Sequence, residues 1–179
     1  MKDLKFEKPT SVEEISQDGN LGRFLVKPLE RGYGLTLGNA LRRVLLSSLP
    51  GAAIVNVKIE GVDHEFSTID GVYEDVMGIV LNLKKVVFST DSQDPHFEQK
   101  VELYAEGPTT VTAEFFNLFD GLTIVNPSQH IATLAEGAKL SMTVTVRRGI
   151  GYVPADQNKH FSKYEVGVIP IDALYTPVE

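Results

Sequence analysis

Two glycines just ahead of a helix-like stretch are the first arrangement in this sequence that could do chemistry. Gly32 and Gly34 precede the amphipathic run Thr36–Leu49, and glycine-rich turns at helix starts commonly bind phosphate. A dinucleotide fingerprint needs G-x-G-x-x-G, but Leu37 stands where the third glycine belongs, and no Gly-Lys-Ser/Thr follows. The spacing therefore disfavours a phosphate site. A small-molecule enzyme built on this loop stays open as an alternative, and it predicts a polar-lined pocket beside Gly32–Gly38.

The acidic residues and histidines offer little for metal or acid–base chemistry. Asp91–Asp94 is followed by Pro95 and is typical of a solvated turn. The sequence has no cysteine, which excludes thiolate zinc sites, disulfides and cysteine nucleophiles. His64 beside Glu65 could form an acid–base pair, but such a residue is more often a surface or interface histidine. No two histidines have zinc-ligand spacing, because at least 30 residues separate His64, His96, His130 and His160. We expect no metal, no cofactor and no catalytic residue.

Composition describes an ordinary globular protein. The 179 residues are 42% hydrophobic and 23% charged, enough for one domain or two small ones. The formal net charge of -7 argues against broad binding to DNA or RNA, which needs clustered lysine and arginine. No apolar run approaches the roughly 18 residues of a membrane span, and the amino terminus does not resemble a secretory signal. Together with the absence of cysteine, these features suit the cytoplasm.

Alternating apolar and polar residues predict a strand-rich chain. The clearest strand is Leu140–Arg147, with Phe97–Ala105 next and a turn at Gly107-Pro108. Further strands are expected at Arg23–Pro28 and at Ile54–Ile59, the latter with an irregularity at Val55. After the last strand, Arg148–Ala155 is predicted to be a loop, and Asp156–Tyr164 a polar, mobile segment.

Two helices interrupt this strand pattern. Thr36 is a plausible N-cap of the first, and Pro50-Gly51 is a stop signal for it. The second is expected to start near Asp70, because acidic residues gather there and favour a helix amino terminus. Its apolar positions at helical spacing are Val72, Val76, Ile79 and Leu83.

The first helix has two different sides. At about 100° per residue, the apolar residues form one broad arc comprising Leu37, Ala40, Leu41, Val44, Leu45 and Leu49. Asn39, Arg42, Arg43 and Leu46 fall opposite. A solvated basic face is the default for such a helix. Leu46 between two arginines instead favours a small interaction site, with an apolar anchor flanked by guanidinium groups.

Several stretches, in order along most of the chain, resemble the α subunit of bacterial RNA polymerase. They are PLERGYGLTLGNALRRVLLSSLPG (28–51), VNVKIEGVDHEFSTIDGVYEDV (55–76), VLNLKK (80–85), RRGIGYVPAD (147–156) and IDALYTPV (171–178). The segment AEFFNLFD (113–120) departs from the family, which usually has an Ala-Asp-Ile-Thr-like run there.

The resemblance implies an α+β, strand-rich architecture in two parts. An α/β dimerisation and assembly domain, here residues 1–50 plus 175–179, would receive an inserted mixed, mainly antiparallel β domain at residues 51–174. Family members continue through returning strands, a second dimerisation helix and a DNA-binding domain. Because this sequence stops at Glu179, we expect it to be a fragment of such a subunit.

The resemblance also assigns residues to partners. Arg43 matches the arginine that the family uses to hold the β subunit, and Leu46 lies one turn beyond it. Arg42 and the loop His64, Glu65, Phe66 and Ser67 match neighbouring β-contact positions. Tyr33, Leu37, Leu41 and Val44, with Leu45, match the side of the helix that packs in the α–α dimer.

The implied function is assembly without catalysis. A family member dimerises and scaffolds the β and β′ subunits for DNA-templated transcription, while the chain itself carries out no step of the nucleotidyl transfer. We expect no cofactor, no membrane and no direct nucleic-acid contact. A β-rich binding module unrelated to a polymerase is the remaining alternative, and it predicts that Arg43 has no effect on β binding.

Overall fold

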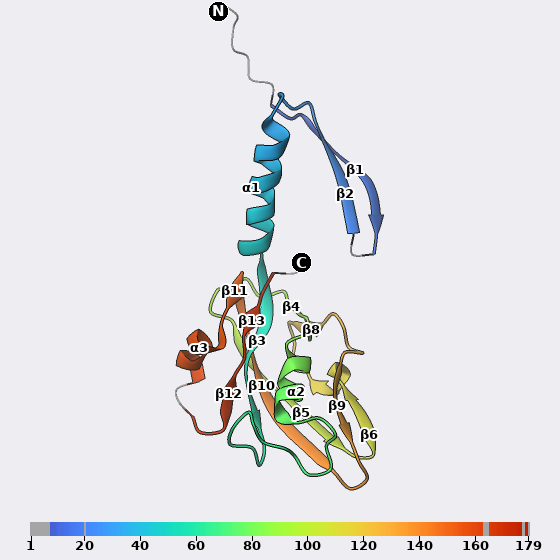
Figure 1. The fold of residues 1–179 in the computed structure, drawn as a ribbon, viewed down its shortest axis with the longest axis vertical. Coiled ribbons are helices and arrows are strands. Elements are labelled where there is room, and N and C mark those ends of the chain that lie inside the picture. The colour runs from blue at the N-terminus through green and yellow to red at the C-terminus, as the bar shows by residue number, and fades with distance from the viewer. Residues whose placement is uncertain (1–7, 20, 163–164, 177, 179) are drawn as a thin grey trace, which may run out of the picture. The chain divides into compact units, whose positions relative to one another are not determined.

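The structure, a computed structural model, describes residues 8–19, 21–162, 165–176 and 178. These form an α+β fold that is rich in strands and has three α-helices (Figure 1). In chain order the elements are β1 (Ser11–Asp18), β2 (Leu21–Lys27), α1 (Tyr33–Ser47), β3 (Pro50–Ile59), α2 (Val76–Leu83), β4 (Phe88–Thr90), β5 (Glu98–Glu106), β6 (Thr109–Thr112), η1 (Ala113–Phe115), β7 (Phe116–Asn117), β8 (Leu122–Ile124), β9 (His130–Leu134), β10 (Lys139–Ile150), β11 (Tyr152–Val153), α3 (Ala155–Asn158), η2 (Lys159–Ser162), β12 (Val168–Pro170) and β13 (Ala173–Leu174). None of the described helices is long and apolar enough to cross a membrane.

The chain divides into two compact units, Met1–Val44 and Leu45–Glu179. The first holds the antiparallel hairpin β1–β2 and most of α1. None of its described residues is buried. The described part of this unit therefore has no core of its own, and a lone hairpin or a lone helix is only marginally stable in water.

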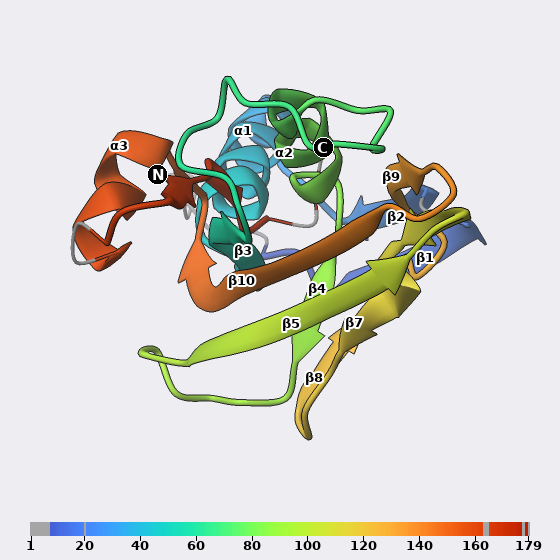
Figure 2. The ribbon, with the colours of Figure 1, turned by 90° about the horizontal axis from the view of Figure 1, so that it is seen from below.

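The second unit is built on one antiparallel sheet in the order β7-β5-β10-β3-β4-β8, with β12 also pairing with β3. The two ends of this order, β7 and β8, are consecutive in the chain, so the sheet curls towards itself (Figure 2). Alternate residues of β5 and β10 face the main core, among them Val101, Leu103, Leu140, Met142 and Val144. The predicted alternation of these two strands is confirmed.

The irregularity predicted at Val55 is a β-bulge. Opposite β10, Asn56 pairs with Thr145 and Ile54 with Val146, which leaves Val55 as the extra residue. An extra residue reverses the side-chain alternation at that point. Ile54 and Val57 therefore both enter the main core, while Val55 joins a small second core with Ala53, Ala173 and Tyr175.

Both helix starts differ from the prediction. Helix α1 begins at Tyr33 rather than at Thr36, so Thr36 lies inside the helix and does not cap it. Helix α2 begins at Val76 rather than near Asp70. Its cap is Asp75, whose Oδ1 accepts a hydrogen bond of 2.7 Å from the Gly78 amide. The preceding residues cannot be helical, because Val72 bridges Leu134 and the Tyr73 amide donates to the Thr133 carbonyl.

The carboxyl-terminal quarter is more ordered than predicted. Arg148–Ile150 continue β10, and Tyr152–Val153 form β11, where a loop was expected. Within Asp156–Tyr164, predicted to be mobile, α3 and η2 form short helical turns; residues 163 and 164 lie outside the described residues. Asn158 is buried, and its amide Nδ2 donates to the Ile171 carbonyl at 2.7 Å. This bond ties α3 to residues 168–176, which contain β12 and β13 and are called the return segment below.

Candidate subunit-interaction surfaces

Helix α1 exposes both of its sides. The residues predicted for dimerisation include Leu41, which is 48% exposed, and Val44, which is 51% exposed. Tyr33 and Leu45 are also exposed, and Leu37 is half-buried. On the opposite side, Arg42, Arg43 and Leu46 are exposed as well. An apolar arc left uncovered in this way is typical of a surface that binds another protein.

The last turn of α1 begins the second unit and is tied to Thr176 within it. The Thr176 hydroxyl donates to the Leu45 carbonyl at 2.8 Å, which satisfies one of the carbonyls left unpaired at a helix end. The next residue, Leu46, therefore starts from a fixed backbone position.

The predicted β-contact loop is a tight, internally bonded turn. The Ser67 amide donates to the His64 carbonyl at 3.3 Å, and the Ser67 hydroxyl lies 3.1 Å from His64 Nδ1. The Ser67 carbonyl accepts from the Val76 amide at 3.1 Å, which ties the turn to the start of α2. Phe66 is 78% exposed, whereas Glu65 is half-buried. The hydrogen bond of His64 goes to Ser67 and not to Glu65, so the structure gives no support to a His64–Glu65 acid–base pair.

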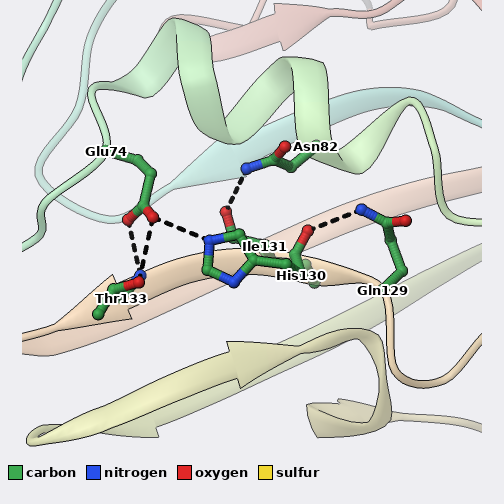
Figure 3. Close-up of polar contacts among 6 residues, drawn as sticks. All are labelled: Glu74, Asn82, Gln129, His130, Ile131 and Thr133. Atoms are coloured by element: carbon green, nitrogen blue, oxygen red, sulfur yellow. Dashed lines mark hydrogen bonds and ion pairs between the residues drawn. The ribbon is translucent and has the colours of Figure 1, made fainter.

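A polar cluster that the sequence analysis missed joins Glu74 and helix α2 to strand β9 (Figure 3). The Glu74 carboxylate accepts hydrogen bonds from the Thr133 amide at 2.6 Å and from the Thr133 hydroxyl at 3.1 Å, and it lies 2.8 Å from His130 Nε2. In the same view the Asn82 side chain donates to the Ile131 carbonyl at 3.0 Å. The segment before α2 and the helix itself are thus both fastened to β9. We call the contacts of Glu74 with His130 and Thr133 the Glu74 clasp.

The clasp alters the acidity of Glu74. Burial raises the pKa of this carboxyl, but hydrogen bonds from the Thr133 amide, His130, its own amide and the Thr133 hydroxyl lower it more. The net pKa therefore lies below the ordinary value of 4.5. A carboxylate with a lowered pKa stabilises the fold above its unfolded-state pKa, and this stabilisation is lost as the pH falls through the folded-state pKa.

We predict that Glu74→Gln lowers the free energy of unfolding of the second unit at neutral pH. The difference in this free energy between the variant and the wild type should shrink below about pH 4.5. Urea unfolding at several pH values between neutrality and about pH 3 measures this. The exposed Glu136 provides a matched control, and Glu136→Gln should leave the pH profile unchanged. A wild-type–Glu74→Gln difference that stays constant down to pH 3 would contradict the role of the ionised carboxylate.

Asp91–Asp94 is a largely exposed connection between β4 and β5, and the turn follows at Pro95 and His96. Ser92 and Asp94 are bonded within this connection, and Asp94 Oδ1 accepts from the His96 amide at 2.8 Å. Arg148 donates to the Ser92 carbonyl at 2.8 Å. In the described parts of the chain, no three histidine, aspartate or glutamate side chains gather as metal ligands would.

A cavity of about 370 Å³ occurs in the second unit. It lies between the end of β10, α3 and Tyr175, and its lining includes Arg147, Gly149, Gln157 and His160. None of its lining residues comes from Gly32–Gly38. The alternative of an enzyme built on that loop therefore gains no support from this cavity.

The comparison with protein families gives this fold its class. Residues 57–176, which cover the curled sheet, α2 and the return segment, match the model described as "RNA polymerase Rpb3/RpoA insert domain". The chain therefore belongs to this family.

Three similar proteins from individual bacteria are all α subunits of DNA-directed RNA polymerase. The α subunit of the DNA-directed RNA polymerase of Aster yellows witches'-broom phytoplasma is 60% identical over 178 residues, covering 99% of this chain and 54% of the relative. The α subunit of Onion yellows phytoplasma is 59% identical over the same shares. That of Leuconostoc mesenteroides is 52% identical over 177 residues, 98% of this chain and 55% of the relative. The resemblance to α subunits is confirmed, and the chain spans about half the length of the curated relatives it matches.

Proposed function

We propose that this chain is the amino-terminal part of the α subunit of a bacterial, cytoplasmic DNA-directed RNA polymerase. It dimerises through α1 and scaffolds the assembly of the β and β′ subunits, without catalysing a step itself. The observation that carries the proposal is the first unit, in which none of residues 8–19 and 21–44 is buried and α1 exposes both sides. A segment without its own core gains its stability by packing against a partner. The relatives, all α subunits, support the choice of partner.

We also propose the division into an assembly domain, residues 1–50 with 175–179, and an inserted domain, residues 51–174. The family model matches 57–176, almost wholly within the proposed insert. The first compact unit ends at Val44, within the proposed assembly segment. Both observations support the division.

The proposed dimer interface is tested by a charge in the apolar arc of α1. Leu41→Glu should shift the chain towards monomer, because a buried carboxylate at an interface is costly unless it is paired. In the wild type, burying this apolar arc stabilises the dimer by roughly 25 cal/mol for each Å², before the cost of association is subtracted. Sedimentation across a concentration series measures the shift.

Leu35 supplies the matched control. It is 75% exposed, and at 100° per residue it falls about 120° around the helix from Leu41. Leu35→Glu should leave self-association unchanged. A wild-type chain that stays monomeric at high concentration, or a dimer indifferent to Leu41→Glu, would mean that the interface is elsewhere.

A further inference from the structure

The segment between β3 and the end of α2 has an unusual charge pattern. From Glu60 to Leu83 it contains six carboxylate residues and no lysine or arginine. Asp63 and Asp70 are exposed, and they flank the turn that carries Phe66. The segment therefore presents negative charge to a partner, and no lysine or arginine of the segment itself neutralises that charge. Such a surface favours a basic partner and disfavours nucleic acid or an acidic membrane.

Two aromatic side chains project from the same segment. Phe66 and Tyr73 are each 78% exposed. The Val76 amide donates to the Ser67 carbonyl and closes a loop of residues 67–76. Tyr73 lies within this loop, and Phe66 immediately precedes it. Exposed aromatic rings of this kind are frequent anchors of protein interfaces, and their faces attract guanidinium and ammonium groups.

Tyr73 stands on a fixed backbone. Its amide donates to the Thr133 carbonyl at 3.0 Å, and the next residue is the centre of the Glu74 clasp. The bridge from Val72 to Leu134 fastens the residue before it. Three consecutive residues are therefore attached to β9, while only the Tyr73 side chain is left in solvent. An aromatic group held in this way loses little freedom on binding.

We infer that Tyr73 is a second aromatic anchor, beside Phe66, of the surface that binds the β subunit, and that it contacts an arginine- or lysine-bearing part of that partner. Glu74 is a positioning residue, since it acts by holding Tyr73 against β9. The inference rests on the proposed function for the identity of the partner. The aromatic pair, the carboxylates around it and the absence of cations in the segment are the observations that define the partner's chemistry.

The test measures the affinity of the chain for the purified β subunit of the Aster yellows phytoplasma polymerase. Tyr73→Ala should weaken binding about fivefold or more with an unchanged melting temperature, whereas Tyr73→Phe should bind nearly as wild type. Phe119, an aromatic residue 58% exposed on the β7–β8 connection, gives the control variant Phe119→Ala, which should bind normally. Wild-type binding should weaken with salt, and Asp63→Asn with Asp70→Asn should reduce that dependence.

A double-mutant cycle separates positioning from plain destabilisation. Glu74→Gln should weaken binding when Tyr73 is present and add little in the Tyr73→Ala background. If the losses of binding free energy caused by Glu74→Gln and Tyr73→Ala simply add in the double variant, Glu74 does not act by positioning Tyr73. Normal binding by Tyr73→Ala, alongside weak binding by Arg43→Ala, would overturn the inference and leave the proposed function standing. If the wild-type chain does not bind β at all, the proposed function fails and the inference fails with it.

Discussion

Arg43→Ala is expected to weaken capture of the β subunit by about tenfold or more while leaving the melting temperature almost unchanged. Losing a central interface side chain typically costs about 2 kcal/mol or more. Arg43 is exposed on α1, on the side opposite the apolar arc. Its guanidinium can form paired hydrogen bonds to carboxylates or carbonyls of a partner, which lysine cannot reproduce. The effect should therefore appear in binding and not in folding. Titration of each purified variant with β, together with thermal unfolding, measures both.

The control is an arginine of similar exposure elsewhere in the first unit. Arg23 lies exposed on β2, and Arg23→Ala should bind β as the wild type does. An equal loss of β affinity in the two variants would indicate a general charge effect. Unchanged β binding by Arg43→Ala would mean that this residue is not part of the interface. Arg43→Lys should fall between wild type and alanine.

Gly51→Ala is expected to destabilise the second unit strongly. A Cβ at this position would lie 1.9 Å from the Tyr175 carbonyl oxygen, which is backbone and cannot rotate away. The strand β3 and the return segment would have to separate, and overpacking of this kind costs roughly 1–3 kcal/mol, occasionally more. For a unit of this size that corresponds to about 3–10 °C in Tm. Differential scanning calorimetry of the whole chain measures it.

Gly38 is a useful comparison for Gly51. It lies within α1, and a Cβ there would meet nothing within 4 Å. Alanine favours a helix over glycine by about 1 kcal/mol, so Gly38→Ala should be neutral or slightly stabilising. A Gly51→Ala protein that melts with the wild type would mean that β3 and Tyr175 do not approach as closely as the structure has them.

Sequence periodicity succeeded where a single face of a strand is buried. Strands β5 and β10 turn alternate residues into the main core, and their alternation predicted them correctly. At Val55 the broken alternation predicted a real bulge, because both faces of β3 are covered. The failures have non-local causes. Residues 70–75 contain the acidic residues expected at a helix start, but Val72 bridges Leu134 and the Tyr73 amide donates to the Thr133 carbonyl, so the helix begins only at Val76.

Long-range polar contacts were beyond sequence reasoning. Glu74 and His130 are 56 residues apart, and neither has a motif around it that indicates the pair. Asn158 belongs to a polar stretch that looks mobile, yet its side chain is buried against the return segment. Gly51 looked like a helix stop, whereas its close approach to Tyr175 is set by the tertiary fold. The β-contact and dimer residues came from the family resemblance, and for them the structure adds exposure and local geometry.

The proposal that this chain captures the β subunit is tested most directly by size-exclusion chromatography. The purified chain and purified β are mixed at micromolar concentration in about 150 mM salt. We expect the two proteins to elute together as one complex that withstands dilution. Separate elution of the two proteins, each at the volume it shows alone, would contradict it.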